Sequence, residues 1–230
     1  SYPGLATRAL SRFARSVHVS FEATVARLPR AREVRVSGNP VRSALGSVDR
    51  AEARRDLGIA DDAFVLFMIG GSRGARRLNA AASEAAPGLA EDGVFAILQT
   101  GEADHEAVRR AVEKASLRGI VEPFFDDVAR PFAASDVVVS RAGATALAEI
   151  ALVGRPSVLV PYPHATEGHQ MLNARSVEES GAAVVVPDDE LTGDTLLETI
   201  RGLRASAHQL AAMADAARKL ARPDAAKRVA

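Results

Sequence analysis

The sequence contains no cysteine, and this absence excludes disulfide bonds and thiolate metal sites. No apolar run reaches the roughly 18 residues that a membrane-spanning helix needs, and the first residues show no signal-peptide pattern. A surplus of one charge is also missing, since 29 basic residues balance 29 acidic ones, so a broad nucleic-acid-binding surface is not expected. The hydrophobic content of 47% is ample for a buried core.

The balanced charge is unevenly distributed along the chain. Residues 1–55 hold eleven arginines and four acidic residues, a net charge of 11 − 4 = +7, so the remainder carries −7. A basic segment can favour phosphates or an anionic membrane surface. The alternative, which we favour for most of these arginines, is a solvated face of an arginine-rich protein.

Short apolar segments alternate with helix-like segments along most of the chain. The expected strands are residues 63–69, 94–100, 119–124, 136–140, 157–161 and 182–186. The expected helices lie near residues 75–90, 104–117, 127–134, 144–153 and 168–180, and residues 205–230 look helical with a break at Pro223. Apolar strands separated by helices indicate a parallel sheet covered on both faces. The sequence therefore predicts a doubly wound α/β domain over residues 42–230, which binds ligands at the carboxyl ends of its strands.

Residues 1–41 do not continue this alternation. A helix-like segment, LATRALSRFARS, is followed by two strand-like segments, VHVSF and EVRVSG, which are too few to form a core of their own. The chain also opens Ser-Tyr-Pro without a methionine. We therefore expect a processed product or a piece of a longer protein, in which residues 1–41 are a stub of a preceding domain and the linker to the next.

Two glycine-containing turns follow expected strands and precede expected helices. In GGSRGARRLN (70–79), the glycines allow a tight turn and the next helix start suits a phosphate, but the run matches neither standard nucleotide fingerprint. In SRAGATALAEI (140–150), Gly143 removes a side chain where the helix begins. Glu149 lies one turn beyond Thr145 on the same helix face, where a carboxylate can accept two hydrogen bonds from the hydroxyls of a ribose. A plain glycine turn and a charge that complements the helix dipole are the alternatives.

Two further segments carry polar groups. VPYPHATEGHQMLNA (160–174) brings two histidines and a glutamine to a loop and helix start, suited to sugar hydroxyls or to simple capping. The histidine spacing is unlike HExxH and no acidic ligand cluster accompanies it, so no metal site is expected. SGNPVR (37–42) supplies Arg42, a permanent cation whose planar fork suits a diphosphate.

These segments, together with PFFDDV (123–128), resemble glycosyltransferase family 28, the peptidoglycan N-acetylglucosaminyltransferases with the GT-B fold, in order and in spacing. The resemblance runs from residue 3 to about residue 187. It implies the carboxyl-terminal half of such an enzyme, which binds UDP-N-acetylglucosamine without a cofactor. The implied reaction is inverting transfer of N-acetylglucosamine to undecaprenyl-diphospho-muramoyl-pentapeptide. It would take place peripherally at the cytoplasmic face of the bacterial plasma membrane, with the acceptor and the catalytic base held by an amino-terminal domain.

Carried to this sequence, the resemblance implies a role for each of several residues. Glu149 would bind the ribose hydroxyls, and Arg42, Ser72 and the backbone at Ala144 and Thr145 would hold the diphosphate. This chain would then need a partner half for turnover.

The remaining implied contacts concern the base and the sugar. The backbone at Phe125 would recognise the uracil edge, and His169 and Gln170 would face the sugar. Three residues depart from the family pattern: Arg73 where glutamine is usual, Ala146 where threonine or serine is frequent, and Gly168 where asparagine or aspartate is common. Two alternatives stay open, namely a UDP-sugar-binding subunit of a split lipid-linked glycosyltransferase and an enzyme like the UDP-N-acetylglucosamine epimerases.

Overall fold

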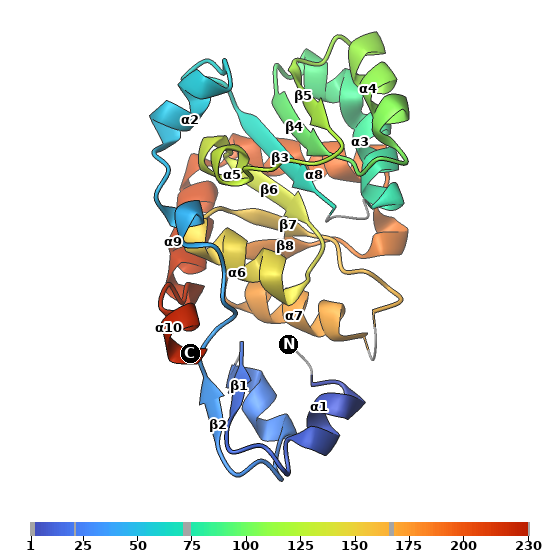
Figure 1. The fold of residues 1–230 in the computed structure, drawn as a ribbon. Helices are drawn as coiled ribbons and strands as arrows, with labels where there is room; N and C mark the ends of the chain where they lie inside the picture. The colour runs from blue at the N-terminus through green and yellow to red at the C-terminus, as the bar shows by residue number, and fades with distance from the viewer. Residues whose placement is uncertain (1–2, 21, 71–74, 166–167, 230) are drawn as a thin grey trace.

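The computed structural model describes residues 3–20, 22–70, 75–165 and 168–229 (Figure 1). Its main feature is a six-stranded, fully parallel sheet in the order β5-β4-β3-β6-β7-β8. The strands are β3 (Val65–Ile69), β4 (Phe95–Gln99), β5 (Gly119–Glu122), β6 (Val137–Ser140), β7 (Ser157–Leu159) and β8 (Ala183–Val185). The doubly wound α/β fold expected from the sequence is confirmed, and each of the six expected strands is present in a slightly shorter form.

Helices cover both faces of this sheet (Figure 1). They are α2 (Arg50–Asp56), α3 (Arg76–Glu91), α4 (His105–Lys114), α5 (Ala129–Ala134), α6 (Ala144–Val153), α7 (His169–Glu179), α8 (Gly193–Ala205) and α9 (Ala207–Leu220), and α10 (Ala225–Val229) follows them away from the sheet. Because side chains alternate along a strand, β3 sends Leu66 and Met68 into the core on one face and Val65 and Phe67 into the core on the other. Strands buried on both sides must be apolar throughout, which is the pattern that the sequence shows.

Two helices were not expected from the sequence, and both have recognisable start signals. Helix α2 begins after Asp49, whose carboxylate accepts from the N–H groups of Ala51 and Glu52. Helix α8 begins after Thr192, whose hydroxyl accepts from the Thr195 N–H. Such side-chain caps satisfy amide groups that the first helical turn leaves free.

Residues before the linker form a smaller unit beside the main sheet. It contains α1 (Leu5–Leu10), a parallel pair of strands, β1 (Val17–Val19) and β2 (Val34–Val36), and a 3₁₀ turn (Glu22–Arg27) between them. Helix α1 covers only the first half of the helix-like segment expected there. Helix α10 at the other end of the chain returns to this unit (Figure 1), where Lys227 and Arg228 face His18 and Arg35 across a polar hollow. The origin of this unit in a preceding domain stays a prediction.

The direction of the winding changes between β3 and β6. From β3 the chain moves outward to β4 and β5, and it then returns to the other side of β3 to add β6, β7 and β8. The carboxyl edge between β3 and β6 is therefore the point at which the winding reverses, and such a point is the usual ligand position, or crevice, in these sheets.

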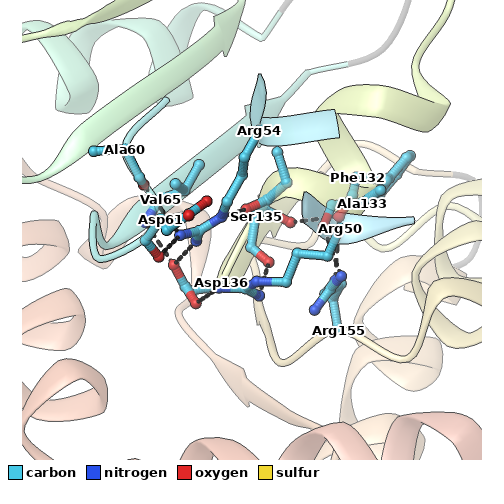
Figure 2. A network of polar contacts seen from close by, with 11 residues as sticks. Arg50, Arg54, Ala60, Asp61, Val65, Phe132, Ala133, Ser135, Asp136 and Arg155 are labelled. Atoms are coloured by element: carbon cyan, nitrogen blue, oxygen red, sulfur yellow. Dashed lines mark hydrogen bonds and ion pairs between the residues drawn. The ribbon is translucent and has the colours of Figure 1, made fainter. Parts of the chain in front are cut away.

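The opposite edge of β3 and β6 is held by a buried ionic network (Figure 2). The Asp136 carboxylate, just before β6, accepts from the Val65 N–H at 2.7 Å and from Arg54 at 2.9 Å, and it also pairs with Arg50. Arg54 is only 2% exposed and donates further hydrogen bonds to the carbonyls of Ala134 and Asp61. Nearly every donor of this buried guanidinium is thus satisfied, which a charge inside a protein requires.

Arg155 extends the network toward β7. It donates to the carbonyls of Phe132 and Ala133 at the end of α5 (Figure 2). Burial lowers the pKa of Arg155 to about 10, and the positive charge of Arg50 acts in the same direction. The guanidinium remains charged at neutral pH despite this shift, so it keeps both hydrogen bonds.

We expect Asp136→Asn to lower the free energy of unfolding by about 3 kcal/mol, because it leaves the buried Arg54 without its counter-charge. Urea denaturation at neutral pH measures the change. Asp215→Asn is the matched control, since Asp215 pairs with Arg218 on the exposed face of α9 and such pairs contribute about 1 kcal/mol or less. Equal losses in the two variants would contradict the assignment of Asp136 as the central residue of this network.

Candidate functional site

A cavity of about 310 Å³ opens at the carboxyl edge of the sheet, on the β3 side of the crevice. Its walls come from the linker before α2, the ends of β3 and β4, the loop after β5 and the first half of α6. This cavity is lined by four residues that the sequence resemblance expected to contact one ligand: Arg42, Phe125, Thr145 and Glu149. They are brought together because parallel strands place all of their following loops at the same edge.

Glu149 is the acidic residue of this cavity. It projects from the second turn of α6, is partly buried and has no hydrogen-bond partner among the described residues. Burial raises the pKa of the Glu149 carboxyl above its usual value, and the nearby Arg42 guanidinium offsets part of that rise. A carboxylate that is partly shielded from water and has no hydrogen-bond partner in the protein can accept hydrogen bonds from a ligand. The alternative of a simple charge complementing the helix dipole does not account for its burial.

The start of α6 presents unsatisfied amide groups beside Glu149. The residue before the helix, Gly143, has no side chain to cap it, so the N–H groups at Ala144 and Thr145 have no partner from that position. A Cβ atom added at Gly143 would meet no described atom within 4 Å. The fold itself therefore does not require glycine here, and the empty space in front of the helix suits a ligand that approaches the backbone closely.

Phe125 reaches the cavity in the loop after β5, but its backbone N–H is already engaged. It donates to Oε1 of Gln99 at 3.3 Å, and Gln99 itself is only 3% exposed at the end of β4. The sequence interpretation missed Gln99, although a polar residue that closes the apolar segment VFAIL was a usable signal. Gln99 shapes this side of the cavity by holding the Phe125 backbone in place.

Arg141, the arginine of the SRAGAT segment, contacts other parts of the chain and does not line the cavity. It donates to the Val160 carbonyl at 3.1 Å, forms an ion pair with Asp188, and lies 5.6 Å from the centre of the Tyr162 ring. These contacts tie the loop after β6 to the segments that follow β7 and β8. Asn173 of α7 adds a hydrogen bond to the Ala142 carbonyl in the same loop.

The two residues expected to face a sugar lie on the neighbouring loop of the same edge. His169 and Gln170 begin α7, which follows β7, and neither lines the 310 Å³ cavity. Oε1 of Gln170 accepts from the Tyr162 N–H at 3.0 Å, so this side chain also supports the loop. Ser72 and Arg73 lie outside the described residues.

Within the described ranges, no group of three or more histidine, aspartate or glutamate side chains is arranged to hold a metal ion. Among the described residues that line the cavity, the positive groups are Arg42 and the amino end of α6. A cation and a helix start can together bind an anion of the size of a phosphate.

Residues 65–229 match the glycosyltransferase family 28 C-terminal domain, and this match covers well over half of the chain. The chain belongs to glycosyltransferase family 28. The family expected from the five sequence segments is therefore confirmed.

The family 28 chain is similar to curated bacterial transferases. It is 37% identical to the UDP-N-acetylglucosamine–N-acetylmuramyl-(pentapeptide) pyrophosphoryl-undecaprenol N-acetylglucosamine transferase of Desulfitobacterium hafniense (strain Y51), over 99% of this chain and 63% of that protein. It is 40% identical to the protein of the same name from Desulforudis audaxviator (strain MP104C), over 96% of this chain and 61% of that protein. The chain thus spans about three fifths of the length of these curated relatives.

Solved structures give the same picture of the family 28 fold. The crystal structure of Acinetobacter baumannii MurG superimposes with a TM-score of 0.77 at 28% identity, covering 99% of this chain and 62% of that one. The Phytolacca americana UGT2 structure, with a TM-score of 0.68 at 19% identity over 98% of this chain and 52% of that one, shows a shared fold alone.

We expect Glu149→Gln to raise the melting temperature of the unliganded protein at about pH 7.5 and to leave it unchanged near pH 4. The folded state raises the pKa of this carboxyl above its ordinary value of 4.5, so it favours the protonated form. The contribution of the protonated Glu149 carboxyl to the free energy of unfolding is therefore fully present below pH 4.5. It is lost as pH rises through the pKa of this carboxyl in the folded protein. Glutamine removes the buried charge and with it the penalty at neutral pH.

Calorimetric melting at the two pH values measures this effect. Glu198→Gln, on the exposed face of α8, is the matched control and should change the melting temperature little at either pH. A Glu149→Gln variant that is less stable than the parent at about pH 7.5 would contradict the interpretation of Glu149 as an unpaired, partly dry carboxylate.

Proposed function

We propose that this chain carries the UDP-N-acetylglucosamine-binding site of a family 28 glycosyltransferase. The observation that carries the proposal is the single cavity that unites Glu149, Arg42, Thr145 and Phe125 at the crevice of the sheet. Its volume of about 310 Å³ is within the range of small-molecule sites. The names of the curated relatives support the same donor sugar nucleotide.

In this proposal each group of the donor has a chemical counterpart. The Glu149 carboxylate accepts hydrogen bonds from the two ribose hydroxyls, which replace the water that burial has removed from it. The diphosphate lies before the start of α6, where it meets the N–H groups at Ala144 and Thr145 and the Arg42 guanidinium, with Ser72 as a further donor. The uracil edge meets the backbone at Phe125, where the carbonyl oxygen can accept from the uracil N3–H, since the Phe125 N–H is bonded to Gln99.

The sugar would extend toward the loop that follows β7. Since Oε1 of Gln170 is bonded to the Tyr162 N–H, the amide N–H₂ of Gln170 remains available to donate to a sugar hydroxyl. His169, the first residue of α7, provides a second polar group on that side. No metal or other cofactor is part of the proposal, because cationic and amide groups of the chain meet the diphosphate.

The reaction proposed for the whole protein is inverting transfer of N-acetylglucosamine to an undecaprenyl-diphospho-muramoyl-pentapeptide acceptor. Departure of UDP concentrates negative charge on the β-phosphate as the bond to the sugar breaks. Arg42 and the amino end of α6 are fixed positive groups near that position, and preorganised groups of this kind stabilise a transition state strongly. Acceptor binding and deprotonation belong, in this proposal, to the whole enzyme together with an amino-terminal domain.

We expect Glu149→Ala and Gln170→Ala to weaken donor binding in different ways. Glu149→Ala should weaken UDP and UDP-N-acetylglucosamine by the same factor, about ten- to a hundredfold, because both ligands contain the ribose. Gln170→Ala should weaken UDP-N-acetylglucosamine by about threefold to tenfold and leave UDP nearly unchanged, because only the sugar nucleotide reaches it.

Titration calorimetry of both ligands against the parent and both variants, in buffer containing EDTA, makes this comparison. A parent chain that loses UDP binding in EDTA would contradict metal-free binding. Gln170→Ala with equal losses for both ligands would show that Gln170 acts only through its bond to the Tyr162 N–H. An unchanged Glu149→Ala affinity would remove the ribose assignment.

The proposal also includes peripheral attachment to an anionic membrane at its cytoplasmic face. Among the described residues, no helix is both long enough and apolar enough to cross a bilayer. Two large apolar side chains near the amino end, Leu10 and Phe13, are nevertheless 65% and 81% exposed. Arg12 and Arg15 lie beside them in sequence, and a mixture of exposed apolar and basic groups suits a surface of anionic lipid.

We expect the chain to sediment with vesicles rich in phosphatidylglycerol and not with vesicles of phosphatidylcholine alone. Phe13→Ser should reduce the bound fraction severalfold, since it removes apolar area that would enter the lipid interface. Leu172→Ser is the control, because Leu172 is exposed on α7 and distant in sequence from the basic segment. Equal binding of the two variants would contradict attachment through residues 10–15.

A further inference from the structure

Thr145 carries the one hydroxyl of the first turn of α6, whose other residues are Ala144, Ala146 and Leu147. It is exposed and lines the 310 Å³ cavity beside Arg42 and Glu149. Its Oγ1 accepts a hydrogen bond of 3.0 Å from Nδ2 of Asn39, which lies 106 residues earlier in the linker. A hydroxyl that accepts from an amide N–H keeps its own proton for another partner.

The backbone around Asn39 is held in one conformation from both sides. Gly38 has φ +85°, and a Cβ atom added there would lie 2.6 Å from Cβ of Arg222, so glycine is required at this close approach. The Gly38 N–H also donates to the Val19 carbonyl at 3.2 Å. Pro40 on the other side restricts Asn39 to an extended conformation. The linker backbone therefore places Asn39 beside Thr145, where its side chain forms the observed hydrogen bond.

We propose that Asn39 is a positioning residue that holds the Thr145 hydroxyl as a hydrogen-bond donor to the diphosphate of the donor nucleotide. The inference rests on the proposed function and adds a side-chain contact to the backbone contact expected at Thr145. The amide of Asn39 occupies a lone pair of the hydroxyl oxygen, and the O–H bond turns toward the space before the helix start. Arg42, three residues further along the same linker, acts on that space as a positive charge.

The proposal can be tested by replacing the hydrogen-bond donor of Asn39 with an acceptor. An aspartate at this position has nearly the same shape but only accepts hydrogen bonds, so it would draw the Thr145 proton toward itself and away from a phosphate. Aspartate also brings a negative charge, which repels a diphosphate whether or not Thr145 is present. The two effects separate in a double-mutant cycle with Thr145→Val, which keeps the side-chain shape and removes the hydroxyl.

The experiment measures UDP binding by calorimetry and uridine binding by NMR titration, on the full chain and on variants whose melting temperatures confirm folding. We expect Thr145→Val to weaken UDP about tenfold and to leave uridine unchanged, and Thr145→Ser to retain parental affinity for both. Asn39→Asp should weaken UDP by about tenfold or more in the parent and by a clearly smaller factor in the Thr145→Val background.

The outcomes separate this inference from the proposed function. A parent chain without affinity for UDP would overturn the proposed function itself. A parent chain that binds UDP, with Thr145→Val binding it equally well, would overturn only the role of the hydroxyl. Equal effects of Asn39→Asp in both backgrounds would show a general charge effect and would overturn the positioning role of Asn39. A loss of uridine binding in Thr145→Val would overturn the assignment to the diphosphate.

Discussion

The carboxylate of Asp136 joins the amino ends of β3 and β6, the two strands between which the winding of the sheet changes direction. Its bonds to the Val65 N–H and to the buried Arg54 fix these strands relative to each other. The backbone ladder between β3 and β6 carries this alignment to their carboxyl ends, since both strands are only four or five residues long. Ile69 at the end of β3, and Thr145 and Glu149 of α6, which follows β6, line the candidate site. The network thus helps to align, from the opposite edge of the sheet, the two strands that lead to the candidate site.

Charged groups are paired at the amino edge of the sheet, whereas the charged group and amide groups at the carboxyl edge lack partners among the described residues. At the amino edge, Arg54 and Asp136 satisfy each other and the surrounding carbonyls, so burial of charge is compensated within the fold. At the carboxyl edge, Glu149 is partly buried with no hydrogen-bond partner among the described residues, and Gly143 leaves the start of α6 without a cap. Each of these features costs stability in the unliganded protein, and each is assigned to a group of the sugar nucleotide in the proposed function. This contrast between a satisfied edge and an unsatisfied edge is what separates scaffold from site in this fold.

The sequence predicted the sheet because its central strands are buried on both faces and are therefore almost entirely apolar, as in residues 137–139. It also predicted which edge carries the site, because that edge follows from parallel winding. It did not predict the Arg54–Asp136 pair, whose members are 82 residues apart, since a sequence rich in arginine offers many possible partners for one aspartate. Gln99 was missed for a related reason: one polar residue at the end of a strand has the same appearance whether it begins a loop or supports a site. The family resemblance gave candidate roles for Arg42 and Phe125, and their contacts became visible only in the fold.

The linker is a part of the candidate site and not merely a connection to it. The boundary that the sequence predicts at residue 42 would leave Asn39 outside the sheet domain, yet Asn39 contacts Thr145 at the start of α6. Arg42 in turn lowers the electrostatic cost of the Glu149 carboxylate. The conformation of the linker depends in turn on the packing of Gly38 against Arg222, which follows α9 near the other end of the chain. A shift of the small amino-terminal unit would move Gly38 first, then Asn39 and Arg42. The charge of Arg42 and the hydroxyl of Thr145, which face the proposed diphosphate position, therefore depend on how that unit packs against the sheet.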